Sequence, residues 1–285
     1  MPSSKSATLL GAGAIALWAT LASLTAVRGA IPPFQTTAIV FAIGGSMVLL
    51  AAAARGRLAL VRPTPASLAL GMAGLFGYHA LYFAALKLAP PAEANLIASL
   101  WALFTVLFSG LLPGHRLRPA HILGAMLGLA AATILVWDKL GVGDAGSTSR
   151  LGFVLAFACA LVWSSYSVAS RLFADVPSES IAVACLATSG LAFASSLAFE
   201  VWTPPDTLSW LALVGLGLGP VGAAFLLWDI GMKGGSVPLL GVLSYASPIL
   251  STALLVALGL AAATWSLAIA CALMVLAAAM ATRAS

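Results

Sequence analysis

The fold of this chain is decided by residues 78–105, which read YHALYFAALKLAPPAEANLIASLWALFT. Polar rings occur there within sequence that is otherwise apolar enough for the interior of a bilayer: Tyr78, His79, Tyr82 and Trp101. A phenol, an imidazole or an indole N–H costs free energy in hydrocarbon unless it finds a hydrogen-bond partner. We therefore expect these four side chains to face protein or an internal cavity rather than lipid.

Composition indicates the class of protein. Of the 285 residues, 62% are hydrophobic and 7% are charged, whereas a soluble domain has about 25% charged residues. The 13 Lys and Arg residues give a net charge of +5, but they are scattered singly at the ends of apolar runs. No basic patch for nucleic acid can be assembled from them. The sequence therefore predicts an integral membrane protein that is surrounded by the lipid bilayer and has no nucleic-acid partner.

Apolar runs of spanning length follow one another along the chain. A transmembrane helix needs about 20 predominantly apolar residues, and proline or glycine pairs such as Pro32-Pro33 and Pro90-Pro91 separate the runs. The predicted fold class is an all-α polytopic membrane protein with ten transmembrane helices. They are expected over Ala7–Val27, Gln35–Ala54, Pro65–Leu88, Ala92–Leu112, Pro119–Asp138, Arg150–Phe173, Glu179–Glu200, Thr207–Gly231, Val237–Gly259 and Thr264–Thr282.

Clusters that would support catalysis or bind a metal are absent from the sequence. Cys159, Cys185 and Cys271 lie inside apolar runs, where we interpret them as packing residues rather than disulfide partners or metal ligands. A membrane enzyme would need clustered carboxylates or a nucleophile beside a base. Almost all of the 8 acidic residues lie at helix ends, and no Asp-rich, HExxH or GxSxG motif occurs. We therefore expect no enzyme activity, no metal and no cofactor.

The basic residues set the expected orientation, because cytoplasmic loops are enriched in Lys and Arg. With a cytoplasmic amino terminus, nine basic residues fall on the cytoplasmic side and four fall on the other side. The four are Arg28, Lys87, Lys139 and Arg150. The sequence therefore predicts a multi-pass protein of the cell (inner) membrane with both termini in the cytoplasm, and we expect a monomer.

The chain also divides near its middle. We assign residues 1–140 to a first five-helix repeat, 141–149 to a linker and 150–285 to a second repeat. Residues 225–252 echo residues 78–105 about 147 positions later, which indicates duplication. Because five is an odd number, the second repeat is inverted in the membrane. Inverted repeats around a central cavity are the usual architecture of alternating-access transporters.

The aromatic residues suggest a binding site. On a helical period Tyr78 and Tyr82 share a face, and Trp163 shares one with Tyr166. Such rings suit a flat apolar or cationic ligand. The alternatives are core packing for the mid-span rings and anchoring at the membrane surface for the tryptophans near helix ends. The tryptophans in that last group are Trp137, Trp202, Trp210 and Trp265.

Two polar residues leave a choice of interpretation. His79 is the one histidine well inside a predicted span, because His115 and His121 lie at or near a loop. His79 either binds the polar end of a solute or is a buried histidine satisfied by the protein. Ser244 either offers its hydroxyl to a ligand or bonds back to its own helix.

Short motifs then point to a known family. They are Leu17-Trp18, Arg28-Gly29, Tyr78, Leu100-Trp101, Trp163 with Tyr166, Trp228 with Gly231, and Ser244-Tyr245-Ala246-Ser247-Pro248. In this order and spacing the chain resembles the EamA-type exporters of the drug/metabolite transporter superfamily, and among them the YddG group of aromatic amino-acid exporters. One difference is that Ala102 follows Trp101, where relatives usually have a proline at or after the tryptophan position.

The resemblance implies a transporter that exports aromatic or bulky apolar amino acids and related metabolites by alternating access. The predicted substrate site comprises Tyr78, His79, Tyr82, Trp101, Trp163 and Ser244 around the central cavity. The alternatives are export of hydrophobic drugs or other metabolites, and a non-transporting scaffold or lipid-handling protein. No Asp or Glu lies at mid-span, so we expect facilitated transport or weak proton coupling through His79.

Overall fold

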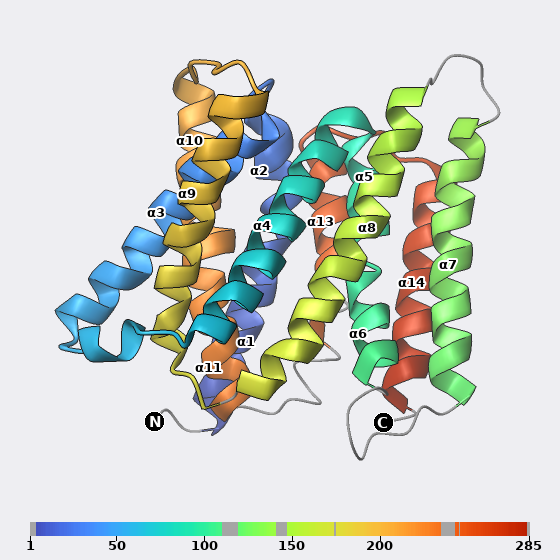
Figure 1. Ribbon diagram of the computed structural model, residues 1–285. Helices are drawn as coiled ribbons and strands as arrows, with labels where there is room; N and C mark the ends of the chain where they lie inside the picture. The colour runs from blue at the N-terminus through green and yellow to red at the C-terminus, as the bar shows by residue number, and fades with distance from the viewer. Residues whose placement is uncertain are drawn as a thin grey trace.

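The structure is a computed structural model that describes residues 4–109, 119–140, 147–173, 175–234, 243–244 and 246–283. Within these ranges the chain is a bundle of helices without a β-strand (Figure 1). The main helices are α1 (Ser4–Ala19), α2 (Leu21–Val27), α3 (Pro33–Ala54), α4 (Pro65–Leu88), α5 (Pro91–Ala98), α6 (Trp101–Ser109), α7 (Pro119–Leu140), α8 (Ser147–Ser170), α9 (Ile181–Phe199), α10 (Thr207–Leu216), the π-helical η4 (Gly217–Ala223), α11 (Ala224–Gly234), α13 (Ala246–Ala257) and α14 (Trp265–Arg283). Short 3₁₀ turns are η1 (Leu58–Val61), η2 (Arg171–Phe173) and η3 (Ser178–Ser180). Most of the predicted linker and the first part of the predicted span Val237–Gly259 lie outside the described residues.

Six helical segments in the described ranges are long and apolar enough to cross a membrane. They have 22 to 24 residues each, or about 33–36 Å at a helical rise of 1.5 Å per residue, which matches a hydrocarbon core of about 30 Å. Shorter apolar helices, Ile122–Ala131, Ala246–Ala257 and Trp265–Ala277, accompany them. The predicted all-helical class is confirmed, whereas the count of ten spans remains a prediction.

One predicted span is divided in two. The sequence predicts a single helix over Ala92–Leu112, but α5 ends at Ala98 and α6 begins at Trp101. The Ser99 hydroxyl donates to the Asn95 carbonyl at 2.7 Å, and the Leu100 N–H donates to the Ile97 carbonyl at 3.1 Å. A side chain that bonds the backbone and a tight three-residue turn interrupt an α-helix without any proline. The missing proline after Trp101 therefore does not make this segment continuous.

A proline does distort the segment predicted over Thr207–Gly231. Pro220 lies in η4, where the Ala224 N–H bonds to the Gly219 carbonyl, five residues back, instead of four. Pro220 cannot donate to the helix, and π-helical turns of this kind accommodate such a disruption. Helix α3 packs tightly on η4, since a Cβ on Gly44 would lie 2.8 Å from the Val221 side chain. Small residues of this kind allow close helix packing in membranes.

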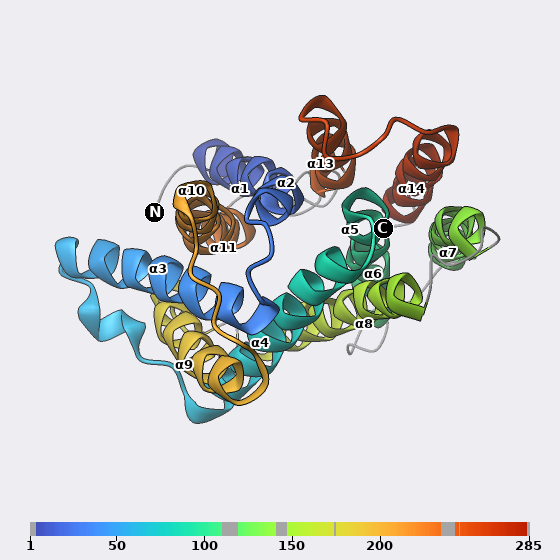
Figure 2. The same ribbon diagram turned by 90° about the horizontal axis from the view of Figure 1, so that it is seen from above.

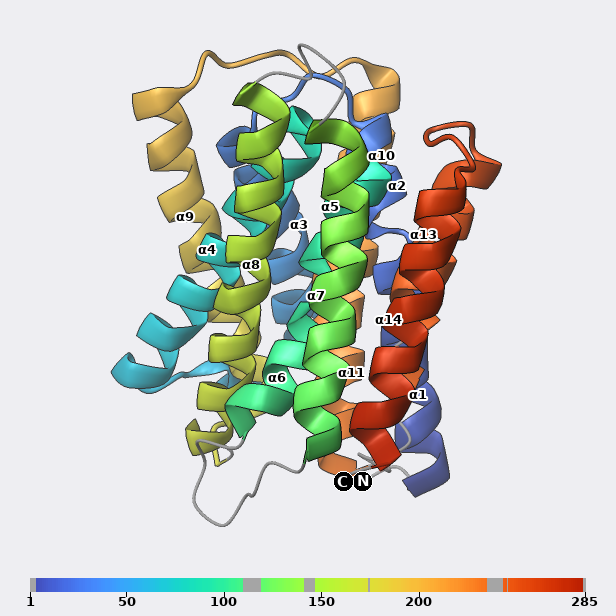
Figure 3. The same cartoon turned by 90° about the vertical axis from the view of Figure 1, so that its right-hand side faces the viewer.

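Helices from the two halves of the sequence lie side by side. Helix α4 packs along α8, and α1 packs along α11 (Figures 1 and 2). Helix α3 packs against α9, and α7 packs against α14. Figure 3 shows that α1 begins and α14 ends at the same end of the bundle, which we call the terminal end. The opposite end is called the far end.

Candidate substrate site

A wide cavity of about 570 Å³ lies within the bundle, a size typical of small-molecule sites. Its inner wall is formed by the rings of Trp18, Trp101, Trp163, Tyr166, Phe225 and Trp228. It extends to the terminal end, where Pro63 and Ser67 at the start of α4 and Pro177 before α9 also line it. The described residues therefore form a ring-lined cavity that leads from the middle of the bundle to the terminal end.

Trp163 lies at the centre of the ring cluster. Its ring stacks on Phe225, with centroids 5.9 Å apart and an interplanar angle of 22°. It also meets the edges of Trp18 and Trp101, each at a centroid distance of 6.4 Å. Trp163, on α8, is 8% exposed, so its apolar surface is almost wholly covered by protein. The arrangement provides ring faces for stacking and a tightly packed aromatic wall.

A second, smaller chamber of about 50 Å³ lies beyond this wall. Trp18, Trp101, Trp163 and Phe225 line both cavities, so these four rings form a constriction between them. The chamber is also lined by Leu21, Tyr78, His79, Asn95, Ser99 and Ser247. The wide cavity is therefore dominated by rings near the constriction, and the chamber beyond it holds amide, hydroxyl and imidazole groups.

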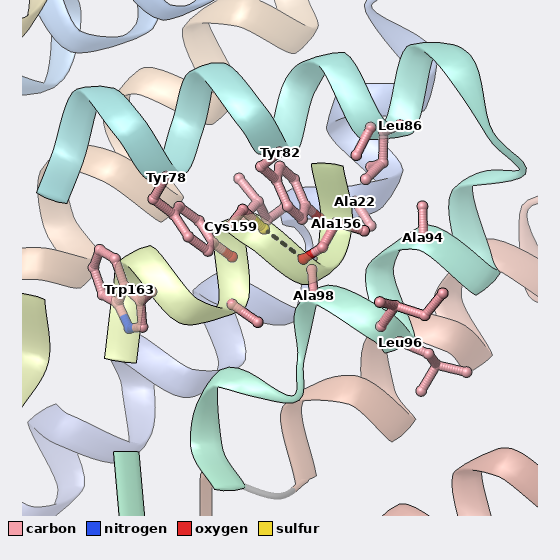
Figure 4. Close-up of a cluster of buried hydrophobic side chains, with 14 of the residues drawn as sticks. Ala22, Tyr78, Tyr82, Leu86, Ala94, Leu96, Ala98, Ala156, Cys159 and Trp163 are labelled. Atoms are coloured by element: carbon pink, nitrogen blue, oxygen red, sulfur yellow. Dashed lines mark hydrogen bonds between the residues drawn. The ribbon is translucent and has the colours of Figure 1, made fainter. Parts of the chain in front are cut away.

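The structure brings most of the predicted site residues together. Tyr78 and His79 line the chamber, and Trp101 and Trp163 belong to the constriction. Tyr82 lies beside Tyr78 on α4, with the two rings stacked 5.6 Å apart (Figure 4). Tyr82 is 1% exposed and lines none of these cavities, because its hydroxyl is directed to a protein partner.

That partner, Asn95, is a site residue that the sequence analysis missed. The Tyr82 hydroxyl donates to Asn95 Oδ1 at 2.8 Å, and Asn95 Nδ2 donates to Ser251 Oγ at 3.1 Å. This network joins α4, α5 and α13 across the bundle. A lone amide within an apolar span was the available signal, since such a group must be hydrogen-bonded when it is buried.

Trp18, Phe225 and Trp228 were also missed as lining residues. The repeat offset of 147 pairs Phe225 with Tyr78, and the two rings each pack against Trp163. Trp18 and Trp228 approach each other with centroids 5.2 Å apart. The internal duplication was therefore the signal that pointed to Phe225.

His79 is largely satisfied by the protein. Its Nδ1 lies 3.0 Å from the Leu75 carbonyl oxygen, and because that oxygen can only accept, Nδ1 must carry the proton. The ring packs against Phe41 at 4.6 Å and Phe225 at 6.0 Å. The sequence left two interpretations open for His79. Nδ1 is hydrogen-bonded within the protein, as expected of a satisfied buried histidine, and Nε2 is the ring nitrogen that remains available to a ligand.

Ser244 lies in a neighbouring position. It is 6% exposed and lines a separate cavity of about 20 Å³ together with Trp101, Ser247 and Met274. Ser247 and Trp101 line both this cavity and the chamber. Ser244 is therefore adjacent to the chamber and does not line it.

A buried polar cluster lies at the far end of the bundle. The Arg28 guanidinium donates to the Ile31 and Phe83 carbonyls and lies over the Phe83 ring at 5.6 Å. Arg28 is 1% exposed. Burial lowers the pKa of Arg28 from 12.5 to about 10, although Glu200 partly offsets this. Arg28 therefore joins the connection after α2 to the C-terminal part of α4.

A second set of hydrogen bonds joins α9 to α3 at the same end. The Glu200 carboxylate accepts from the Phe34 and Gln35 amides at 2.8 and 2.9 Å and from the Ser196 hydroxyl at 3.0 Å. Gln35 and Thr203 exchange two further hydrogen bonds at 2.7 and 2.9 Å. A carboxylate at a helix N-terminus is favoured by the unpaired amides and the helix dipole. These contacts tie the end of α9 and the segment after it to the start of α3.

The remaining expectations concern metals, cysteines and exposed tryptophans. No group of three or more His, Cys, Asp or Glu residues that could hold a metal occurs in the part of the chain that the structure describes. The three cysteines are free thiols. Trp202, Trp210 and Trp265 are 43%, 45% and 86% exposed near helix ends, where we predicted surface anchors. The Trp137 side chain lies outside the description.

Two segments of the chain, residues 5–137 and 150–283, each match the EamA-like transporter family. The chain belongs to the EamA-like transporter family. The resemblance that the sequence motifs indicated is thereby confirmed. The two matched segments make this EamA-like transporter a protein with two copies of one family unit, and the family together with several apolar helices makes it a multi-pass membrane protein.

Named relatives of this EamA-like transporter are exporters. It is 54% identical over 281 residues to the aromatic amino acid exporter YddG of Ancylobacter novellus, covering 98% of both chains. It is 27% identical over 276 residues to the protein of the same name from Escherichia coli, covering 87% of both chains. It is also similar to a solved crystal structure at 54% identity, with a TM-score of 0.80 and coverage of 99% and 98% of the two chains.

Proposed function

We propose that this protein exports aromatic amino acids across the cell membrane by alternating access. The observation that carries the proposal is the ring-lined cavity of about 570 Å³ in a chain that is 54% identical to an aromatic amino acid exporter. The rings supply stacking surface for an aromatic side chain. Among the described residues that line the cavity, none is charged, which also suits export of neutral hydrophobic drugs, the second candidate.

The proposed architecture is ten helices in two inverted five-helix repeats, 1–140 and 150–285, with a linker at 141–149 and one chain as the transporting unit. The symmetry between two inverted repeats would make the contact of α4 with α8 equivalent to the contact of α1 with α11. Both contacts occur in the structure. Leu17-Trp18 recurs as Val162-Trp163 145 positions later, and this offset pairs Leu21 on α2 with Tyr166 on α8. Helix α2 packs on α4 at the far end, whereas Tyr166 and Trp228 both line the wide cavity.

This difference supports a two-state cycle. In the other state, α8 would close on α11 around Tyr166 while α2 would separate from α4, because the two repeats exchange conformations. The proposed orientation places the terminal end in the cytoplasm. Arg28 is buried, so we do not count it among the loop charges. Nine basic residues then lie on the cytoplasmic side and three on the opposite side. The wide cavity then opens to the cytoplasm, from which an exporter takes its substrate.

Transport in proteoliposomes tests the function. Labelled phenylalanine should exchange, and unlabelled aromatic amino acids should compete with it while neutral hydrophobic dyes should not; this result supports amino-acid export. Transport of dyes without exchange of any amino acid would favour the drug exporter.

Thiol labelling in a cysteine-free background tests the orientation. A cysteine at Thr148, beside the start of α8, should react with an impermeant reagent in intact cells, and one at Lys5 should react only after lysis. The reverse pattern would contradict the orientation.

A further inference from the structure

The chamber beyond the ring constriction differs from the wide cavity in both size and chemistry. It measures about 50 Å³, against about 570 Å³ for the wide cavity. The chamber is therefore much the smaller of the two spaces, and its lining holds the amide, hydroxyl and imidazole groups that a small polar group such as an amino-acid head group needs.

One amide hydrogen of Asn95 has no acceptor among the described residues. Its Oδ1 accepts from Tyr82 and one Nδ2 hydrogen is donated to Ser251. The amide has two N–H groups, and no second recipient occurs among the described residues. Asn95 is 7% exposed and lines the chamber. A buried donor without a partner costs free energy, so a ligand oxygen in the chamber would complete the network.

Other groups around the chamber fit the two ends of a zwitterion. Helix α6 begins at Trp101, and the N-terminal end of a helix favours an anion. The Tyr78 side chain is 8% exposed, and its hydroxyl has no hydrogen bond within the described part of the chain. The rings of Tyr78 and Trp163 both line the chamber, and aromatic rings attract a nearby ammonium group.

The charge balance favours a solute that brings both charges. No Asp, Glu, Lys or Arg is among the described residues that line the wide cavity, the chamber or the Ser244 cavity. A single charge would stand without a partner in a low-dielectric space, which is costly. A zwitterion carries its own counter-charge and presents no net charge to the chamber.

We propose that the chamber binds the zwitterionic head group of the amino acid, with Asn95 donating a hydrogen bond to the carboxylate, while the side chain stays in the wide cavity. The substrate then spans the constriction of Trp18, Trp101, Trp163 and Phe225. This assignment rests on the proposed export of amino acids. It adds Asn95 as the residue that selects amino acids over aromatic compounds of similar shape.

The test is competition against labelled phenylalanine in proteoliposomes. Phenethylamine lacks the carboxylate and 3-phenylpropionate lacks the ammonium, while both keep the ring. Each should compete at least about tenfold more weakly than phenylalanine, which corresponds to about 1.4 kcal/mol. In Asn95→Leu, which keeps a similar size, the affinity for phenylalanine should fall about tenfold and its advantage over phenethylamine should shrink to about the same extent.

Thr188→Val provides a matched control, because Thr188 is fully buried on α9 and its hydroxyl has no described partner. Thr188→Val should leave the affinity for phenylalanine and the affinity for phenethylamine unchanged. If wild-type protein exchanges phenylalanine but phenethylamine competes equally, the subsite is wrong and the proposed function stands. If no aromatic amino acid is exchanged, both are wrong. If Asn95→Leu does not fold, the wild-type competition series decides alone.

Discussion

The indole N–H of Trp18 donates a hydrogen bond to the Pro220 carbonyl at 3.0 Å, across 202 positions of sequence. Pro220 lies in η4, where the Ala224 N–H bonds to Gly219 and not to Pro220. Trp18 therefore supplies a donor to a carbonyl at the distorted turn and joins α1 to the eighth predicted span. The same side chain belongs to the ring constriction, so one residue joins the distorted helix to the wall between the two cavities.

Trp18→Phe removes this donor and keeps a ring. A carbonyl left without its partner in the bundle costs about 1–3 kcal/mol, so we expect a lower midpoint of thermal unfolding in detergent. Trp210→Phe is the control, because Trp210 is 45% exposed and donates no hydrogen bond within the described residues. Equal midpoints for the two variants would contradict the structural role of the Trp18 N–H.

Trp101→Ala tests the stacking wall. Trp101 is half-buried and lines the wide cavity, the chamber and the Ser244 cavity, so its loss should cost about 1 kcal/mol of binding, a few-fold to tenfold in apparent affinity for phenylalanine. Trp202→Ala, at an exposed position, should change neither transport nor stability. Normal transport by Trp101→Ala would assign this ring to packing alone.

Trp163 has to be tested with a substitution that keeps an aromatic ring. Because its ring contacts Trp18, Tyr78, Trp101 and Phe225, Trp163→Ala would empty part of the core at a cost of about 3–5 kcal/mol. Trp163→Phe keeps an aromatic face and should fold. We expect it to retain transport with a weaker affinity for phenylalanine. A variant that folds and binds phenylalanine as wild type does would exclude Trp163 from the site.

Glu200→Gln tests the hydrogen-bonded cluster at the far end. The substitution places an N–H group where a carboxylate oxygen accepts from the Phe34 or Gln35 amide, which should destabilise the protein by about 1–3 kcal/mol. The matched control is Glu179→Gln. Glu179 forms an ion pair with Arg57 at 3.2 Å, and the Arg57 side chain is 58% exposed. Surface ion pairs of this kind contribute about 0–1 kcal/mol to the free energy of unfolding. Unfolding midpoints that shift equally would show that the Glu200 cluster is not a structural clamp.

Asp206 should make stability depend on acid. Its side chain caps α10 by accepting from the Ser209 amide at 2.7 Å, and hydrogen bonds from the Ser209 amide and hydroxyl lower the pKa of Asp206 from 3.8. A folded pKa below the unfolded value stabilises the fold above about pH 4, and the effect is lost as the pH falls through the lowered pKa. The difference in unfolding midpoint between wild type and Asp206→Asn should therefore shrink between pH 6 and pH 3. A difference that stays constant with pH would rule out this linkage.

Local properties of the sequence were sufficient for the class and for much of the site. Hydrophobic run length predicted the membrane helices, since spanning a bilayer sets a minimum number of apolar residues. The cost of polar rings in hydrocarbon singled out Tyr78, His79, Tyr82 and Trp101. The structure places Tyr78, His79 and Trp101 at the constriction or the chamber, whereas Tyr82 lines neither. These arguments succeed because the free-energy cost of placing a polar side chain in hydrocarbon depends on the type of side chain. It can be judged before the packing of the helices is known.

Only the tertiary structure decided which helix faces meet. Three interruptions within predicted spans, at Thr20, at Ser99 and at Pro220, set the direction of the segments that follow them. They bring Trp18 and Phe225 to Trp163 and move Ser244 into a neighbouring cavity. The sequence by itself determined that polar groups inside the bilayer must find partners. That Asn95 pairs with Tyr82 and Ser251, 13 and 156 positions away, was decided by packing between distant helices, because non-local contacts leave no periodic pattern in the chain.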